Sequence, residues 1–522
     1  MANDSIRNIV IVGGGSAGWI AAGIIASEFI DSAHQDISVT LIESPDVKII
    51  GVGEGTWPTM RTTLQKIGIT ETEFLTECCA SFKQGTKFIG WVNGSEDDYY
   101  YHPFTAPAGY SGFNMVPYWL EQKNKVSFVN AVSAQGHLCD RHLAPKQAST
   151  PEYAAVANYA YHLDAGKFAA LLQRHCTAKL SVRHVLDHVT HINGDPDQNI
   201  ESLSTAHSGD IKGDLFVDCT GFAAMLLGQH FGIPYLDKQH FLCNDSALAI
   251  QVPYADSHSP IASQTLSVAK SAGWIWDIGL TTRRGIGYTY SSAHITDDAA
   301  AAELKTYVET SGGKIPEQFE PRKISFRPGH REKFWHKNCV AVGMSAGFLE
   351  PLEASALVLV ELAAKMISED LPATHGVMEI VARRYNEKFS YRWDRIIDFL
   401  KLHYVLSKRA DSEYWADHRR NDSVPDSLKE LLTLWQHHIP GHGDFSHSEE
   451  VFSAASYQYI LYGMGFVTRP RPSARLARNA AKAQQLFVEN MQNANKIVAN
   501  LPTNRDLLQQ IEQHGLPTAN VA

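Results

Sequence analysis

The chain has few cysteines, no excess of basic residues and no unbroken hydrophobic run of membrane-spanning length. Its seven cysteines among 522 residues are an odd number without a Cys-x-x-Cys pair, which argues against a disulfide framework and favours a reducing cytoplasm. The net charge of −10, from 46 basic and 56 acidic residues, disfavours nucleic acid and anionic membranes as partners. The most apolar stretch, residues 9–26, is interrupted by glycines 13–15 and lacks a basic leader, so we expect neither a signal peptide nor a membrane helix.

What is present is the composition of a folded protein, with 44% apolar and 20% charged residues. The length allows two to four domains, or one large core with insertions. Strands that end in glycine-bearing turns recur through the first 370 residues, and helical patterns dominate afterwards. We therefore expect an α/β module in residues 1–370, with insertions at about 95–150 and 225–325, and a mostly helical region in residues 371–522.

The N-terminus reads as a strand, a glycine turn, a helix and a second strand. Residues 8–12 and 37–43 are the two apolar strands, and residues 19–30 are the helix. Between strand and helix, the spacing Gly-x-Gly-x-x-Gly is met by Gly13, Gly15 and Gly18. Glu43 ends the second strand, where a carboxylate can accept ribose hydroxyls. The pattern predicts dinucleotide binding; the alternative is a glycine-rich helix cap in an unrelated α/β protein.

The glycines alone do not separate FAD from NAD, because both cofactors use the same pyrophosphate contacts. After Glu43 comes a glycine-rich strap, residues 49–59 (IIGVGEGTWPT), which can lie along a large ligand. The chain has no second strand followed by Gly-x-Gly-x-x-Gly that would serve a nicotinamide cofactor. We therefore expect one dinucleotide, FAD.

Seven motifs, in family order, resemble the flavin-dependent halogenases of the tryptophan halogenase group. They are GGGSAGW (13–19), GVGEGTWP (51–58), SFKQGTKF (81–88), YHPF (101–104), DCTGF (218–222), GWIWDIGL (273–280) and GFLEPLEASA (347–356). The resemblance implies a Rossmann-like FAD module of the single-component flavin monooxygenase type with a mostly helical substrate-covering region. It also implies an activity in which FADH2 from a separate flavin reductase, oxygen and chloride or bromide give hypohalous acid, which halogenates an electron-rich, indole-type ring.

The resemblance implies two catalytic residues, Lys83 and Glu353. The lysine would hold hypohalous acid by hydrogen bonding or become a haloamine, which requires the neutral amine that burial favours. The carboxylate would position the oxidant or take the ring proton. Without the family, the first would be read as a surface charge and the second as a helix-entry carboxylate. The halide site would be the backbone amides of Ser355 and Ala356, although Ala354 departs from the family's usual serine-threonine pair.

Further positions follow from the same motifs, with ordinary core packing as the alternative. The expected FAD contacts are Gly13, Gly15, Ser16, Ala17, Gly18, Glu43, Glu54, Gly55, Val189, Met344 and Leu357. A wall between the flavin and the substrate is implied at Trp274, Trp276 and Ile278, with Gly279 in place of the family's proline, and substrate contacts at His102 and Phe104. Residues 453–465 only loosely resemble the segment that holds the amino-acid group in tryptophan-specific enzymes. We therefore expect a smaller indole or another electron-rich arene as substrate.

Other readings of the sequence are weaker. A flavin-dependent aromatic hydroxylase would use the same module without Lys83 or halide, and a degenerate flavin-binding homologue would explain Gly279 and Ala354. The histidines of WQHHIPGHGDFSH (435–447) are interpreted as a solvated loop and not as a metal site, and Cys78 and Cys79 as buried thiols. The sequence leaves a homodimer open.

Overall fold

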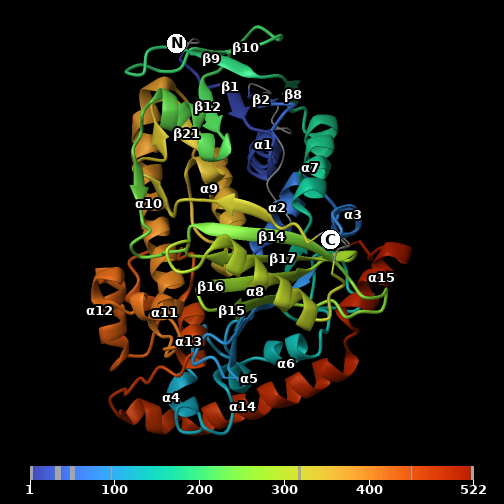
Figure 1. Cartoon of the computed structure of the whole chain (residues 1–522), viewed down its shortest axis with the longest axis vertical. Coiled ribbons are helices and arrows are strands. Elements are labelled where there is room, and N and C mark those ends of the chain that lie inside the picture. The colour runs from blue at the N-terminus through green and yellow to red at the C-terminus, as the bar shows by residue number, and fades with distance from the viewer. Residues whose placement is uncertain are drawn as a thin grey trace. The chain divides into compact units, whose positions relative to one another are not determined.

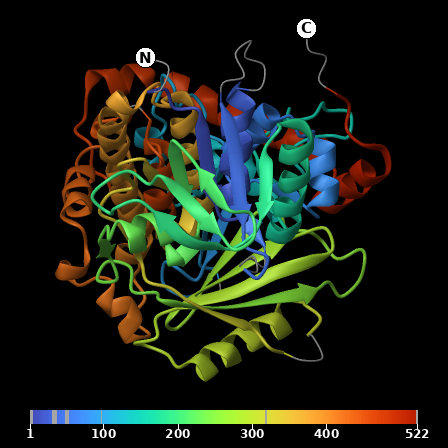
Figure 2. The same cartoon turned by 90° about the horizontal axis from the view of Figure 1, so that it is seen from above.

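The computed structural model describes residues 4–29, 37–47, 53–95, 97–315, 319–447 and 449–518. The chain divides into two compact units, each assembled from three stretches of sequence (Figures 1 and 2). The first unit comprises Met1–Cys79, Leu163–Gln239 and Arg327–Trp393. The second comprises Ala80–His162, His240–Phe326 and Asp394–Ala522.

A six-stranded sheet forms the centre of the first unit. Its strand order is β20-β21-β12-β1-β2-β8, and β1 runs parallel to both of its neighbours. The central strands are continuous apolar runs, as expected for parallel strands that are covered on both faces. The bounds are β1 (Asn8–Val12), β2 (Ser38–Glu43), β8 (Arg183–Leu186), β12 (Leu215–Asp218), β20 (Trp335–His336) and β21 (Cys339–Ala341).

Helices cover this sheet. Helix α1 (Ser16–Phe29) is buried at every residue from Gly18 to Ala26 because it packs between α7 (Ala165–Lys179) and α9 (Ser355–Glu369) (Figure 1). Two shorter helices, α2 (Thr59–Ile67) and α3 (Glu71–Glu77), follow strand β3 (Glu54–Gly55) in the chain. Two small antiparallel sheets complete the unit: β9 (Val189–Asn193), β10 (Ser202–Thr205) and β11 (Asp210–Lys212), and β13 (Tyr235–Asp237), β19 (Gly329–Arg331) and β22 (Gly347–Phe348).

A seven-stranded sheet organises the second unit, in the order β18-β14-β17-β16-β15-β5-β6. All neighbours are antiparallel except β15 and β5. Helix α8 (Asp297–Thr310) packs on one face through Leu304 and Val308 (Figure 2). The bounds are β5 (Gly85–Ile89), β6 (Tyr99–Pro103), β14 (Ser246–Pro253), β15 (Thr265–Ala269), β16 (Gly273–Gly279), β17 (Arg283–Tyr290) and β18 (Arg322–Ser325). Strand β4 (Ser81–Lys83) pairs separately with β7 (Ala160–Leu163).

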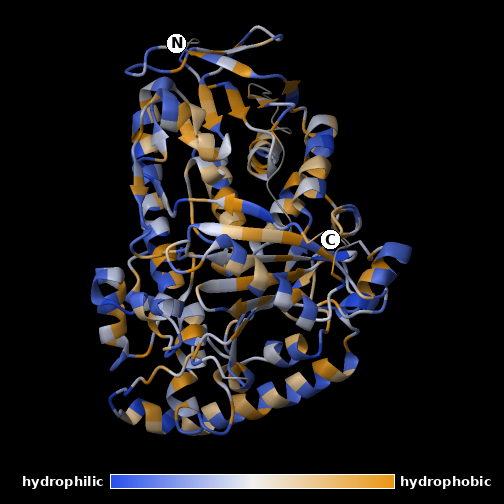
Figure 3. Ribbon diagram, in the orientation of Figure 1, coloured by the Kyte–Doolittle hydropathy of each residue, from blue (hydrophilic) through white to orange (hydrophobic). Residues whose placement is uncertain are grey.

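The C-terminal part of the chain is helical, as predicted. Its helices are α10 (His375–Val405), α11 (Glu413–Asp417), α12 (Asp426–Trp435), α13 (Ala454–Gly463), α14 (Ala474–Asn500) and α15 (Asn504–His514). Helix α14 alternates polar and apolar residues along its length (Figure 3) and contacts the short helices α4 (Val116–Trp119), α5 (Phe128–Val132) and α6 (Gln135–Asp140). No helix in the described part of the chain combines the length and apolarity needed to cross a membrane. The predicted mixed α/β fold with a helical C-terminal region is confirmed.

Candidate active site

The glycine turn between β1 and α1 is shaped by close backbone contacts. Gly13 has a φ of 120°, and a Cβ atom there would lie 2.2 Å from the carbonyl oxygen of Cys219. A Cβ atom on Gly18 would lie 1.9 Å from the carbonyl oxygen of Gly13. Side chains at these two positions would therefore force strand and helix apart. The fold itself requires the first and third glycines of the motif.

Gly15 differs from these two because the protein does not crowd it. Apart from its two chain neighbours, no described residue has an atom within 4 Å of the position that a Cβ atom would take. Helix α1 begins at the next residue, and the first amides of a helix lack partners within the helix and attract anions. An uncrowded glycine directly before the amides of Ser16 and Ala17 is compatible with the predicted pyrophosphate contact.

Glu43 lies beside this turn at the end of β2. A Cβ atom on Gly14 would come within 2.1 Å of the Glu43 carboxyl carbon, so the carboxyl group packs directly against the backbone of Gly14. Its Oε2 atom lies 2.9 Å from Nε2 of His184 on the neighbouring strand β8. The structure thus brings the predicted ribose acceptor next to the predicted pyrophosphate site.

The strap is tied to the segment that carries Glu353. Residues 49–52 of the strap lie outside the described residues. Further along, the indole nitrogen of Trp57 donates a hydrogen bond of 2.8 Å to the carbonyl oxygen of Glu353. Thr59 and Thr63 on α2 donate to the buried carboxyl group of Glu361 on α9, over 3.1 and 2.5 Å. Three hydrogen bonds therefore join the strap and helix α2 to helix α9 and its entrance.

The entrance to α9 is conformationally unusual. Glu353 (φ 63°, ψ 6°) and Ala354 (φ 55°, ψ 43°) are consecutive non-glycine residues in the left-handed region. Each such residue costs about 1–2 kcal/mol, and such strain is concentrated at functional sites. Glu353 is 7% exposed. The N-cap residue of α9 is Ala354, whose side chain makes no capping hydrogen bond to the first amides of the helix that begins at Ser355. The chain thus presents a buried carboxylate and a helix N-terminus in one short segment.

The other predicted flavin contacts occupy several elements of the first unit. Glu54 and Gly55 form β3, and Leu357 lies in the first turn of α9. Met344 lies near Gly221, where a Cβ atom would be 3.6 Å from its methyl carbon. Val189 begins β9, in a different sheet from the glycine turn.

Lys83 is the last residue of β4 and is buried, with 1% of its surface exposed. Its ammonium nitrogen lies 5.3 Å from the ring centroid of Phe104, a cation–π distance. Phe104 follows β6, and its backbone amide donates to the carbonyl oxygen of Gln84, next to the lysine. His102 is also buried, and its ring packs 5.5 Å from that of Phe399. The structure therefore brings Lys83 and Phe104 together and places His102 in a neighbouring aromatic cluster.

Sequence reasoning missed His162, a buried residue on β7 that pairs with Ser81 of β4. Its Nε2 atom is 2.8 Å from the hydroxyl of Thr265, and Nδ1 has no hydrogen-bond partner among the described residues. Burial, reinforced by the charge of Lys83, holds the pKa of His162 well below its usual value. The imidazole is therefore neutral. In the sequence, the apolar run around His162 indicates only a strand. Nothing there marks the histidine as a neighbour of Lys83.

The predicted wall is the buried strand β16. Trp274, Trp276 and Ile278 are 2%, 8% and 5% exposed, and the two indole rings meet edge to face at 6.3 Å. Gly279 ends the strand in a crowded place, where a Cβ atom would lie 3.0 Å from the hydroxyl of Tyr254. Its carbonyl oxygen accepts a 2.5 Å hydrogen bond from Ser81. The glycine in place of the family's proline therefore lies at a packed junction with the strand of Lys83.

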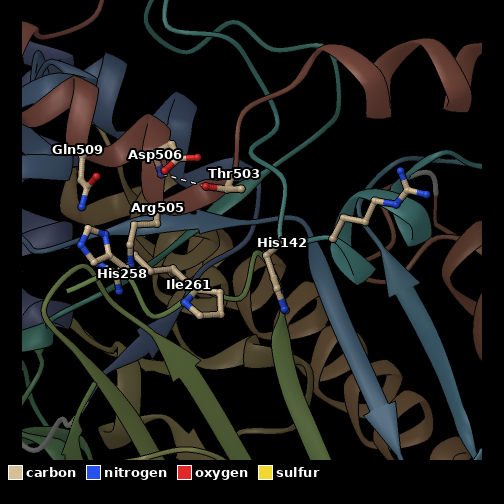
Figure 4. A pocket seen from close by; sticks show the side chains of 9 residues that line it. His142, His258, Ile261, Thr503, Arg505, Asp506 and Gln509 are labelled. Atoms are coloured by element: carbon tan, nitrogen blue, oxygen red, sulfur yellow. Dashed lines mark hydrogen bonds between the residues drawn. The ribbon is translucent and has the colours of Figure 1, made fainter. Parts of the chain in front are cut away.

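Helix α15 also supports the lysine strand. The side-chain amide of Asn504 donates to the carbonyl oxygen of Phe82 over 3.1 Å. Next to this helix end lies a cavity of about 240 Å3, whose lining includes His142, His258, Ile261, Thr503, Arg505 and Gln509 (Figure 4). None of the predicted site residues lines this cavity.

The cysteine and histidine clusters noted in the sequence have ordinary contacts. Cys78 and Cys79 are buried free thiols, and burial raises the pKa of the first. His438 pairs with Asp444 at 3.0 Å, and the ring of His442 lies 4.9 Å from that of Tyr110. Across the described ranges, no group of three or more His, Cys, Asp or Glu side chains is arranged to hold a metal ion.

Comparison with known proteins places this site in a family. The tryptophan halogenase family matches residues 8–482. A tryptophan 6-halogenase of Streptomyces toxytricini is 33% identical over 95% of this chain and 96% of its own length. The crystal structure of a tryptophan halogenase from Shewanella frigidimarina is 48% identical, covers 99% of both chains and superposes with a TM-score of 0.95. A flavin-dependent halogenase from Brevundimonas sp. is 31% identical over 97% of this chain and 99% of its own, with a TM-score of 0.86. The chain therefore belongs to the tryptophan halogenase family, and it is an enzyme of the flavin-dependent halogenase class.

Proposed function

We propose that the enzyme uses reduced FAD, oxygen and chloride or bromide to generate hypohalous acid, and that Lys83 delivers the halogen to an electron-rich, indole-type ring. The observation that carries the proposal is the burial of this lysine beneath the ring of Phe104, at the end of a strand held by Ser81 and Asn504. Lysine is among the residue types that are least often fully buried, so the burial of Lys83 calls for a specific reason.

The first unit would hold the cofactor. The amides after Gly15 bind the pyrophosphate, and Glu43 binds the ribose. In its reduced form, bound FAD supplies the oxygen-activating chemistry that oxidises the halide. The flavin ring is flanked by Glu54, Gly55, Val189, Met344 and Leu357. The backbone amides of Ser355 and Ala356, which the N-cap residue Ala354 does not cap with its side chain, bind the halide, as amides at a helix start suit an anion.

Lys83 can act in two protonation states. The ring of Phe104 favours the ammonium form, which donates hydrogen bonds to hypohalous acid, whereas burial favours the neutral amine. The neutral nitrogen takes the halogen from hypohalous acid, and the amine proton leaves with the hydroxide as water. When the ring carbon takes the halogen, the N–X bond breaks, the displaced ring proton passes to the carboxylate of Glu353, and an equivalent proton returns to the nitrogen, which restores the neutral amine of Lys83. His162, being neutral, adds no competing positive charge beside the lysine.

The substrate we propose is a small indole or another electron-rich arene, in contact with His102 and Phe104. Residues 453–465 contain no charged side chain that would pair with the ammonium or carboxylate of an amino acid. In the same segment, the buried hydroxyl of Tyr459 donates to the carbonyl oxygen of Thr105 over 2.9 Å. We further propose that a separate flavin reductase supplies the reduced FAD, because the sequence has no motif for a nicotinamide cofactor.

The experiment that tests this function combines the purified enzyme with FAD, a generic flavin reductase, NADH and either bromide or chloride. Indole, free tryptophan and a panel of arenes are then screened by mass spectrometry. We expect a product with a halogen isotope pattern, and more of it from indole than from tryptophan. A product that gains one oxygen regardless of halide would identify a hydroxylase. The absence of any flavin-dependent product would indicate a non-catalytic flavin-binding homologue.

A further inference from the structure

His184 is joined to Glu43, the residue that we expect to bind the ribose. The two residues lie on adjacent parallel strands, β8 and β2. Nε2 of His184 is 2.9 Å from Oε2 of Glu43, and the side chains are 18% and 24% exposed. A carboxylate in this partly covered position is held more tightly by a hydrogen bond than a carboxylate in open water.

A third residue sets the tautomer of this histidine. The side-chain amide nitrogen of Gln173 on α7 lies 3.2 Å from Nδ1 of His184. Because an amide nitrogen only donates, Nδ1 must accept, and the ring proton of a neutral imidazole then sits on Nε2. Nε2 therefore donates to Glu43. The chain Gln173, His184, Glu43 is a directed row of hydrogen bonds that ends on the carboxylate.

Packing contacts also hold the imidazole ring of His184 and the carboxyl group of Glu43 in place. The ring of His184 meets the indole of Trp19 edge to face, with centroids 5.2 Å apart. Glu43 packs against the backbone of Gly14, where any Cβ atom would overlap the carboxyl group. The glycine in this variable position of the motif therefore makes room for the carboxylate.

From this arrangement, we propose that His184 is a positioning residue for the adenosine half of FAD. It holds the Glu43 carboxylate in the orientation in which that group accepts the ribose hydroxyls. The inference rests on the proposed function in one respect, namely that the chain binds FAD at the glycine turn.

Two replacements of His184 separate hydrogen bonding from packing. His184→Phe keeps a ring against Trp19 but removes both nitrogens. His184→Gln keeps a donor that reaches about as far as Nε2. A third variant, Gln173→Met, leaves the histidine in place and removes the group that sets its tautomer. His207→Gln, at an exposed histidine of the same unit, is the control.

Affinity is measured by calorimetry with three probes: FAD, ADP for the adenosine half, and FMN for the flavin half. We expect His184→Phe to bind FAD and ADP at least about tenfold more weakly, as for loss of a hydrogen bond to a charged group, and to bind FMN normally. His184→Gln and the control should stay near wild type, and Gln173→Met should fall between. In a Glu43→Gln background, His184→Phe should have little further effect, because the histidine acts through the carboxylate.

The outcomes distinguish the inference from the function on which it rests. If His184→Phe and Gln173→Met bind FAD and ADP like the wild type, or if the His184→Phe loss persists in full in the Glu43→Gln background, the positioning role is wrong while FAD binding stands. If the wild-type protein binds neither FAD nor ADP, the proposed function fails, and the inference fails with it. Should His184→Phe not fold, Gln173→Met alone decides between these results.

Discussion

The three motif glycines of the turn differ in their surroundings, and we expect two of them to serve folding and one to serve ligand binding. Gly13 and Gly18 are in contact with backbone atoms, so larger residues there would disturb the strand, the helix or both. Gly15 is not crowded by any of the described residues beyond its chain neighbours. The sequence motif treats the three glycines alike, and only the structure shows which two of them are crowded by backbone atoms.

Gly15→Ala should therefore separate the two roles. We expect the stability of the FAD-free protein to change by less than about 0.5 kcal/mol, as at sites without packing contacts. The affinity for FAD should fall at least about tenfold, because the methyl group would occupy the pyrophosphate space. Thermal unfolding and FAD titration check both expectations. Gly443→Ala is the control, because no described residue beyond its chain neighbours lies within 4 Å of a Cβ atom there. An unchanged FAD affinity in Gly15→Ala would contradict the assignment.

The left-handed pair before α9 leads to a second prediction at this scale. Ala354→Gly should raise the free energy of unfolding by up to about 1 kcal/mol, since glycine adopts this conformation without strain, although its unfolded chain is more flexible. Ala356→Gly, two residues later and inside the helix, should instead lower it by up to about 1 kcal/mol. Urea unfolding of both variants measures the difference. Equal destabilisation by the two substitutions would show that Ala354 is not strained.

At the scale of elements, the sequence located local segments well. The predicted strand 8–12 matches β1, and the predicted strand 37–43 matches β2 to within one residue. The predicted helix 19–30 begins three residues early, at Ser16, because the glycines alone form the turn. Helix α9 begins at Ser355, because Glu353 and Ala354 adopt the left-handed conformation. Apolar periodicity marks an element, but it does not report the backbone conformation at its ends.

The sequence alone could not predict which distant strands pair with one another. In the seven-stranded sheet, β5 pairs with β15, where Thr86 lies opposite Thr265, and the register depends on side chains from both parts of the chain. The contact of Asn504 with Phe82 spans 422 residues. No periodicity in a single sequence reports such contacts, so the supports of Lys83 could not be predicted.

The buried contact of Thr59 and Thr63 on α2 with Glu361 on α9 makes the free energy of unfolding depend on pH. Burial raises the pKa of Glu361 from its ordinary value of 4.5 to about 7. Between these values the folded protein holds a proton that the unfolded chain has released, so stability falls as the pH rises through this window and levels off above it. The shift corresponds to a loss of up to about 3 kcal/mol by pH 8.

Glu361→Gln keeps the side-chain shape beside Thr59 and Thr63 but cannot ionise. Its stability relative to the wild type should rise from pH 5 to pH 8, as measured by denaturant unfolding at each pH. Glu369→Gln, at an exposed position of the same helix, should track the wild type. Parallel curves for Glu361→Gln and the wild type would show that Glu361 is not a protonated buried acid near neutral pH.

At the scale of the whole molecule, motifs predicted more of the function than composition did. Charge and cysteine content only excluded classes of protein, whereas seven short motifs indicated the family that the comparisons then showed. The division into a flavin module and a substrate-covering region stays a prediction, as do the site roles of individual residues. His162 and His184 carry no motif, because their importance comes from neighbours that only folding brings together.

The central claim is that Lys83 transfers the halogen to the substrate. The most direct measurement compares Lys83→Ala with the wild type for three quantities: FAD affinity, free hypohalous acid caught by a scavenger, and halogenated arene detected by mass spectrometry. Lys87→Ala is the matched control, since Lys87 also lies over an aromatic ring, 4.2 Å from that of Tyr99, but pairs with Asp140. We predict that Lys83→Ala binds FAD and still releases hypohalous acid, yet loses the halogenated arene almost completely, whereas Lys87→Ala retains it. Halogenated arene at wild-type levels from Lys83→Ala would contradict the account.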